Sequence, residues 1–363
     1  MKPYISLALV LAAASGMAFG AATAYTPPVG YISIPLPGTA GASPTRLQVA
    51  SQGLLPSDTL QYAGVVDSFG SDAGGTYLLD SKGTWAAGDY INSLAAPTFR
   101  SHLVEITSGP LIGTLTWVKS TQANKIYTFD DISAALAGAS YRVLKAFKVS
   151  TLLGTVPTST VLAGAANIGT ADNFLLFDPD LKSYKTFWYK SGGIGGTGWR
   201  CDDLTITTPG EAAIHPNDSG MVFVRKQSSD GVLVISGSVK SGVNGVFIRG
   251  GAGTVLNIVS VLQPVGQLTP ATSGLYTTNP ATGVLGAANI GTADNILVFD
   301  AAANKYTIFW YKSGGIGGTG WRCDNAAITD PTNYVFPPES AILIQRKNGT
   351  NFTWNIPAVV IAP

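Results

Sequence analysis

The chain has 363 residues, a formal net charge of +1 and only 12% charged residues, whereas soluble domains average about 25%. The sequence has no basic patch and no acidic run. This composition argues against nucleic acid and anionic membrane surfaces as partners. The 43 glycines and 21 prolines, with frequent Val, Ile, Thr and Tyr, favour an all-β fold of short strands joined by tight turns.

The first segment has the pattern of a secretory signal peptide. Lys2 precedes an uncharged, mostly apolar run over 4–19, and Ala22-Thr23-Ala24 follows as a cleavage site. A membrane anchor, the alternative, needs about 20 apolar residues. We therefore predict a signal peptide at 1–24 and an exported protein (extracellular, cell-surface or periplasmic) with no membrane span after signal cleavage.

Residues 25–147 contain short strand-like runs separated by turn residues, which predicts a small antiparallel barrel or sandwich domain. One helical turn is expected at Asp130–Gly138. An alternative boundary stays open, because "VGYISIPLPG" (Val29–Gly38) loosely resembles "NGVFIRGGAG" (Asn244–Gly253). The first repeated module could then begin at residue 29, with a separate β-domain inserted after about residue 52.

The C-terminal part of the chain contains one segment twice. Gly164–Asp203 matches Gly286–Asn325 at an offset of 122, with thirty of forty positions identical. Farther along, Ile214–Lys226 aligns with Val335–Lys347 at an offset of 121. Solenoid repeats are about 20–50 residues long, so a period near 120 indicates two complete small domains in tandem. We expect module A at 148–240 and module B at 241–363.

Each copy contains a predicted hairpin of an apolar strand and an aromatic strand, "NFLLFD" with "SYKTFWYK" and "NILVFD" with "KYTIFWYK". With the charged Lys185 assigned to the outward face, strand alternation places Trp188 inward and Tyr189 outward. The same phase in the second copy places Trp310 inward and Tyr311 outward.

The stretch "FWYKSGGIGGTGWRCD" occurs at Phe187–Asp202 and again at Phe309–Asp324. It contains G-x-G-x-x-G, but no helix or βαβ pattern surrounds it, so a dinucleotide site is not expected. Two interpretations stay open: a structural loop whose glycines supply positive φ and whose tryptophans plug the core, or a duplicated ligand platform. The candidate ligand-binding residues are Tyr189, Lys190, Trp199, Arg200, Tyr311, Lys312, Trp321 and Arg322.

Cys201 and Cys323 occupy equivalent positions in the two copies. They either form a disulfide that clamps the copies together or are small buried residues that were copied by duplication. The motif "GAANIGTADN" offers oxygen donors at Asn167, Asp172 and Asn173, but it lacks the spaced carboxylates of a calcium loop, so an Asx-turn is favoured. We predict no metal and no cofactor.

The sequence offers few residues that could catalyse hydrolysis. His102 and His215 are the only histidines, and the second copy has none where His215 stands. His102 and Glu105 lie at odd spacing on a predicted strand and would point to opposite faces. A nucleophile elbow is absent from the sequence. We therefore expect a non-enzymatic protein.

The motif "KSGGIGGTGWR", with "TADNFLLFD" before it and a strand ending in "RK" after it, resembles a family of exported bacterial β-repeat proteins. As implied by this resemblance, the family combines a signal peptide, an opening close to "PVGYISIPLP" and one or two GG-x-GGTGWR modules. The resemblance covers most of the mature chain and implies no activity, and the two cysteines are atypical of it.

We predict an exported structural or surface-associated interaction protein whose partners are envelope or matrix components, further copies of the chain, or glycans. The alternatives are a carbohydrate-binding protein that uses the duplicated loops and, second, a secreted hydrolase.

Overall fold

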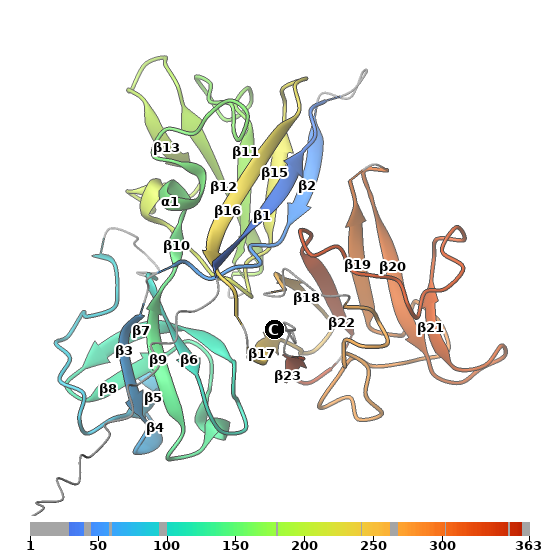
Figure 1. The fold of residues 1–363 in the computed structure, drawn as a ribbon, viewed down its shortest axis with the longest axis horizontal. Coiled ribbons are helices and arrows are strands. Elements are labelled where there is room, and N and C mark those ends of the chain that lie inside the picture. The colour runs from blue at the N-terminus through green and yellow to red at the C-terminus, as the bar shows by residue number, and fades with distance from the viewer. Residues whose placement is uncertain are drawn as a thin grey trace, which may run out of the picture.

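The computed structural model describes residues 29–39, 45–57, 60–93, 100–178, 181–240, 242–261, 268–301, 303–347 and 349–357. The predicted signal peptide at 1–24 lies outside these residues. The all-β class is confirmed: antiparallel sheets make up three lobes (Figure 1). Within the described part of the chain, no helix has the length and hydropathy that a membrane crossing requires.

The elements in chain order are β1 (Val29–Leu36), β2 (Arg46–Ala50), β3 (Leu60–Val65), β4 (Ser68–Asp72), β5 (Gly75–Leu79), β6 (His102–Ile106), β7 (Leu115–Gln122), β8 (Lys125–Thr128), η2 (Ser133–Ala135), β9 (Ser140–Lys145), β10 (Phe147–Lys148), α1 (Val149–Leu153), β11 (Asn173–Asp178), β12 (Ser183–Lys190), β13 (Gly198–Cys201), η3 (Pro209–Glu211), β14 (Ala213–Ile214), β15 (Met221–Arg225), β16 (Gly231–Ser238), β17 (Asn244–Ile248), β18 (Thr254–Val259), β19 (Asn295–Asp300), β20 (Lys305–Lys312), β21 (Gly320–Cys323), β22 (Ile342–Lys347) and β23 (Phe352–Ile356). The expected helical turn at Asp130–Gly138 contains η2, a single 3-10 turn.

The first lobe, called unit A, comprises residues 29–54 and 147–240. Its five-stranded sheet has the order β13-β12-β11-β15-β2, and the two-stranded ribbon β1-β16 lies opposite it. Ile34 and Leu233 of the ribbon pack with Phe174, Phe187 and Phe223 of the sheet in one buried core. Side chains alternate between the two faces of each ribbon strand, so each strand buries every second residue and leaves the residues between them on the outer face.

The second lobe, called the central domain, comprises residues 55–146. Its strands form one curved sheet in the order β3-β9-β6-β7-β8-β5-β4. The two edge strands, β3 and β4, are consecutive in the chain, so the sheet bends back on itself around a core that includes Val104, Val118 and Tyr141.

The third lobe, called unit B, comprises the described residues between 242 and 357. Its five-stranded sheet, β18-β22-β19-β20-β21, and its ribbon, β17-β23, repeat the strand order of unit A. Corresponding pairs share their register: Trp188 lies opposite Arg200, and Trp310 lies opposite Arg322.

The sheets do not follow the predicted boundary at residue 147. β1 pairs with β16 and β2 pairs with β15, so residues 29–50 belong to the same sheets as 148–240 rather than to a domain at 25–147. The central domain is inserted between β2 and β10 of unit A, the arrangement that the resemblance of Val29–Gly38 to a later segment left open. The predicted boundary did not assign residues 29–50 to unit A because β1 and its partner β16 are far apart in the chain.

The predicted face of the aromatic strand is wrong in both units. In β12, Lys185, Phe187 and Tyr189 are buried, whereas Trp188 lies half-buried on the opposite face. The prediction assigned Lys185 to the outward face of the strand. Its side chain instead points inward and forms an ion pair with Asp203 at 3.1 Å. A buried charge with a partner overrides the rule that places charges outside.

The outer faces of the two five-stranded sheets pack against each other. Val49, Phe177 and Val222 of unit A share one buried cluster with Ile258 and Leu343 of unit B. The Ser51 amide donates to the Glu339 carbonyl at 2.8 Å across the same interface. Units A and B are therefore joined by an apolar layer.

Candidate functional site

The repeated segment forms a β-hairpin in each unit, β12–β13 in unit A and β20–β21 in unit B. In the connecting loop of unit A, Gly192, Gly193, Gly195 and Gly196 have φ values of +106°, +76°, +95° and +74°. Only glycine adopts such angles without strain. The loop backbone therefore requires this glycine pattern, and the second copy repeats the same conformation.

The two basic residues of each hairpin bind carbonyl oxygens of their own loop. The Lys190 ammonium donates to the Ile194 carbonyl, and the Arg200 guanidinium donates to the Gly195 carbonyl at 2.9 Å and the Trp199 carbonyl at 3.0 Å. These bonds cross-brace the loop, so the predicted ligand donors of unit A hold its own backbone.

Unit B repeats this bracing. The Lys312 ammonium donates to the Ile316 carbonyl, and the Arg322 guanidinium donates to the Gly317 carbonyl at 3.0 Å and the Trp321 carbonyl at 2.9 Å. Each loop is thus held by a lysine and an arginine of its own hairpin.

The candidate tryptophans are core side chains. Trp199 is 7% exposed, donates from Nε1 to the Gly154 carbonyl at 3.0 Å and meets the Tyr189 ring edge-on with centroids 5.8 Å apart. Trp321 is 5% exposed and lies in the core of unit B. The structural interpretation of the tryptophans therefore fits, and the proposed flat, exposed platform is not present at these residues.

The remaining candidate aromatic, Tyr311, is half-buried and stacks on Tyr276 with ring centroids 3.4 Å apart and an interplanar angle of 10°. One of its faces is therefore already covered by a residue of the same unit. In unit A the equivalent Tyr189 is buried, so the two copies differ at this position.

The loop tips instead present isoleucine. Ile194 and Ile316 are each 98% exposed, the highest values among large apolar side chains of the described residues. Sequence reasoning missed both, although a clue existed: the tip is identical in the two copies while buried positions such as Phe174 and Ile296 differ. An exposed side chain has no core-packing reason to be retained.

The two hairpins lie on different sides of the molecule. β13 lies at the upper left of Figure 1 and β21 at the right edge. The two loops therefore lie on different lobes and are well separated in this view.

Comparisons with protein-family models, curated proteins and solved structures gave no match.

Of the two alternatives for the cysteines, the structure has no bridge: Cys201 and Cys323 are both free. The reason is their placement, since Cys201 belongs to the core of unit A and Cys323 packs against the core of unit B. Burial raises the pKa of the Cys201 thiol to about 12. Burial also raises the pKa of the Cys323 thiol.

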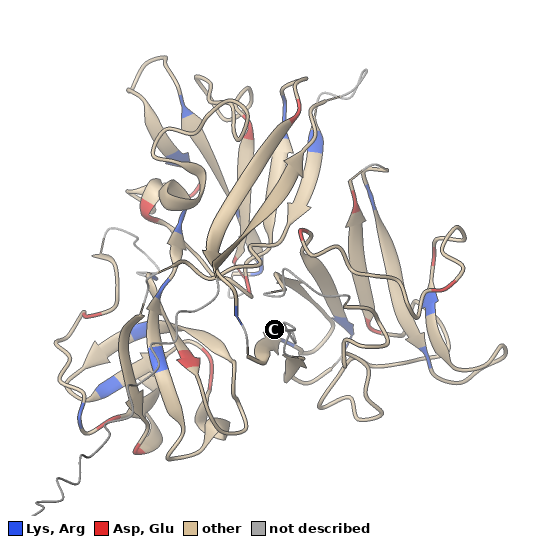
Figure 2. Ribbon diagram, in the orientation of Figure 1, with Lys and Arg blue, Asp and Glu red and all other residues tan. Residues whose placement is uncertain are grey.

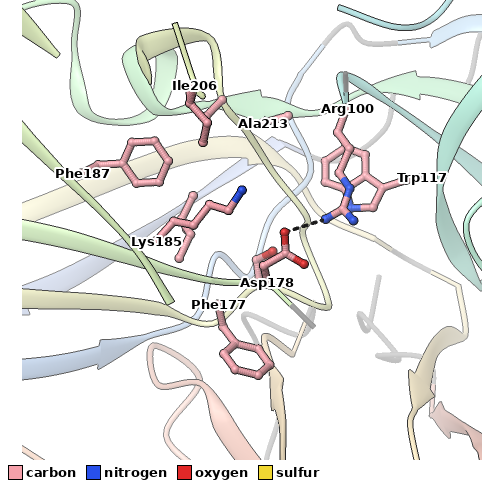
Figure 3. A pocket seen from close by; sticks show the side chains of 11 residues that line it. Arg100, Trp117, Phe177, Asp178, Lys185, Phe187, Ile206 and Ala213 are labelled. Atoms are coloured by element: carbon pink, nitrogen blue, oxygen red, sulfur yellow. Dashed lines mark ion pairs between the residues drawn. The ribbon is translucent and has the colours of Figure 1, made fainter. Parts of the chain in front are cut away.

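A small cavity lies where the central domain meets unit A (Figure 3). Its volume is about 50 Å³, room for a few waters at about 10–15 Å³ each. Lys185 and Asp178 point into it beside Arg100, which forms an ion pair with Asp178 at 3.7 Å and lies over the Phe129 ring at 4.5 Å. Each charge at the cavity has an opposite charge beside it, so the arrangement joins the two lobes.

The histidines are placed as neutral structural groups. His215 is buried, and its Nδ1 accepts the Asn217 and Asp218 amides at 3.1 and 2.9 Å. Burial lowers its pKa well below the ordinary value. Burial also lowers the pKa of His102 to about 4. Glu105 forms ion pairs with Arg142 and Lys240 rather than with His102.

The oxygen donors weighed for calcium are used within the fold. Asn167 Oδ1 accepts the Thr170 amide at 3.1 Å, which makes the favoured local turn. Asp172 forms a fully buried ion pair with Arg225 at 3.0 Å. Within the described ranges, no group of three or more His, Cys, Asp or Glu side chains is placed to hold a metal ion.

Proposed function

We propose that this protein is an exported, non-enzymatic, surface-associated interaction protein that contacts its partners through the isoleucine tips of its two hairpins. The observation that carries the proposal is the 98% exposure of both Ile194 and Ile316. Each stands on a glycine loop that a lysine and an arginine of the same hairpin hold in place.

The energetics favour such a tip as a contact. Fully burying an isoleucine side chain stabilises by about 1.5–3 kcal/mol. The bonds from Lys190 and Arg200 order the loop in advance, which reduces the entropy lost on binding.

The arrangement of the tips indicates bridging. Because β13 and β21 lie on different sides of the molecule (Figure 1), the tips would contact two partner molecules. A protein of this kind links components of an envelope or matrix. Export rests on the predicted signal peptide, and the 12% charged residues suit a protein whose surface is partly covered.

The alternatives have less support. A carbohydrate platform requires exposed aromatic faces, whereas Trp199 and Trp321 are core residues. A hydrolase requires titratable groups near a cleft, whereas His215 is buried beneath Trp117 and Glu105 is held in ion pairs.

Cell fractionation tests the proposal. The full chain is produced in its own organism as wild type and as the double variant Ile194→Ser/Ile316→Ser. We expect wild type in the envelope fraction and the double variant mainly in the medium. Ile112→Ser, at a 40% exposed apolar residue of the central domain, is the matched control and should fractionate as wild type. Wild type free in the medium, or a double variant retained like wild type, contradicts the proposal.

A further inference from the structure

The ribbon of unit A has an uncharged and largely apolar outer face. Val29, Tyr31, Val232 and Val234 are 66%, 74%, 50% and 57% exposed. Neither β1 nor β16 contains a charged residue (Figure 2). Exposed edge strands usually carry lysine or another charge that prevents pairing with another chain. This ribbon has no such charge.

The backbone groups at the edge of β1 can be assigned from the ladder. Ser238, the partner of Val29, exchanges both backbone bonds with Leu55, at 2.7 and 3.0 Å, on the side away from β1. Residue pairs in an antiparallel ladder alternate between bonded and non-bonded. Val29, Tyr31 and Ser33 therefore turn their N–H and C=O groups away from β16, toward the outer edge.

The equivalent edge of unit B is occupied. Gly38 donates to Asp230 Oδ1 at 2.8 Å, and Gly250 donates to Asn351 Oδ1 at 2.8 Å, so these two glycines mark equivalent positions. Five residues before each glycine stand Ser33 in β1 and Gly245 in β17.

The Gly245 amide donates to the Gly113 carbonyl of the central domain at 3.1 Å, and Thr114 forms a bridge with Gly245. Among the described residues, β16 is the one strand with which β1 pairs. The same edge is thus paired with another part of the chain in unit B, whereas in unit A no strand of the described residues pairs with it.

We propose that β1 pairs with β1 of a second copy of this chain, antiparallel, about a twofold axis at Tyr31. In this register Tyr31 lies opposite its own counterpart, and Val29 lies opposite Ser33 of the other copy. All three residues turn their backbone groups outward, so the donors and acceptors match. Pro35 lacks an N–H and ends the pairing.

A second copy fits this edge better than a charged partner, because two neutral strands meet without repulsion and join two two-stranded ribbons into one four-stranded sheet. This self-association is independent of the isoleucine tips, which lie on other elements.

Cysteine cross-linking tests the register in mature protein that carries Cys201→Ser and Cys323→Ser. The Cα atoms of a bonded antiparallel pair are about 5.5 Å apart, within the roughly 4.4–6.8 Å that a disulfide spans. Tyr31→Cys should give a disulfide-linked dimer on a non-reducing gel. Val29→Cys mixed with Ser33→Cys should give a heterodimer, whereas Val29→Cys alone should not. Val65→Cys, a 50% exposed position on the edge strand β3, is the control and should stay monomeric.

Sedimentation equilibrium of the wild type should show a dimer. Ser33→Pro, which removes an outward N–H, should shift the equilibrium to monomer with an unchanged circular dichroism spectrum. A monomeric wild type, an unlinked Tyr31→Cys, or linkage of Val65→Cys to the same extent would overturn the proposal.

Discussion

The fully buried ion pair of unit B gives the sharpest stability prediction. Asp294 and Arg346 side chains are both 0% exposed, with 2.6 Å between Asp294 Oδ2 and Arg346 Nη1. The same carboxylate accepts the Leu285 and Lys347 amides, each at 2.6 Å. Asp294→Ala would leave a buried guanidinium without its counter-ion and two backbone donors without an acceptor. Breaking a buried pair costs about 3–5 kcal/mol, so we expect at least that loss in the free energy of unfolding.

Urea unfolding followed by tryptophan fluorescence measures this loss, because Trp354 lies in the same core. The double variant Asp294→Ala/Arg346→Met should recover much of the stability, since no unpaired charge remains. Lys305→Ala, at an exposed position, is the control and should change stability by less than about 0.5 kcal/mol. If Asp294→Ala costs no more than this control, the reasoning on the buried pair is refuted.

Three further predictions concern protonation, thiols and the domain boundary. Burial lowers the pKa of His102 from 6.5 to about 4, so the folded protein takes up the His102 proton at lower pH than the unfolded chain does. The stability that this shift contributes is therefore present above pH 6.5 and falls as the pH drops toward 4. The variant His102→Asn should flatten this pH dependence of thermal unfolding, and an unchanged pH profile would contradict the prediction. Titration of the denatured, non-reduced protein with a thiol reagent should find two free thiols, and fewer than two would indicate a disulfide. In the native protein, Cys323 should react with the reagent faster than the more buried Cys201. A chain lacking residues 29–54 should lose protection from hydrogen exchange in β15 and β16, their sheet partners, whereas retained protection would restore the boundary at 147.

Local sequence signals predicted the β class and the hairpins, and they offered the core-plugging role of the tryptophans as one of two interpretations. Alternation, turn residues and the duplicated segment all lie within short stretches of chain. The insertion of the central domain could not be assigned in the same way, because Val29 pairs with Ser238 and no local pattern reports such a contact. The loose similarity of Val29–Gly38 to a later segment was the one available clue.

The repeated hairpin could be located from the sequence, but neither its inward face nor its exposed tip could. Lys185 misled the assignment of faces because its charge is neutralised inside by Asp203. Ile194 was overlooked because an apolar residue between glycines reads as part of a loop, and only its 98% exposure in the fold distinguishes it. The exposure of a side chain at a loop tip depends on how the whole hairpin folds, and no local sequence pattern predicts it.

The central claim is that two equivalent tips contact two partner molecules, and binding to isolated envelope fragments tests it most directly. Wild type, Ile194→Ser, Ile316→Ser and the double variant are mixed with the fragments, and both bound protein and fragment clustering are measured. We predict that wild type binds and clusters the fragments, that each single variant binds without clustering, and that the double variant does neither. Equal binding and clustering by all four proteins would contradict the account.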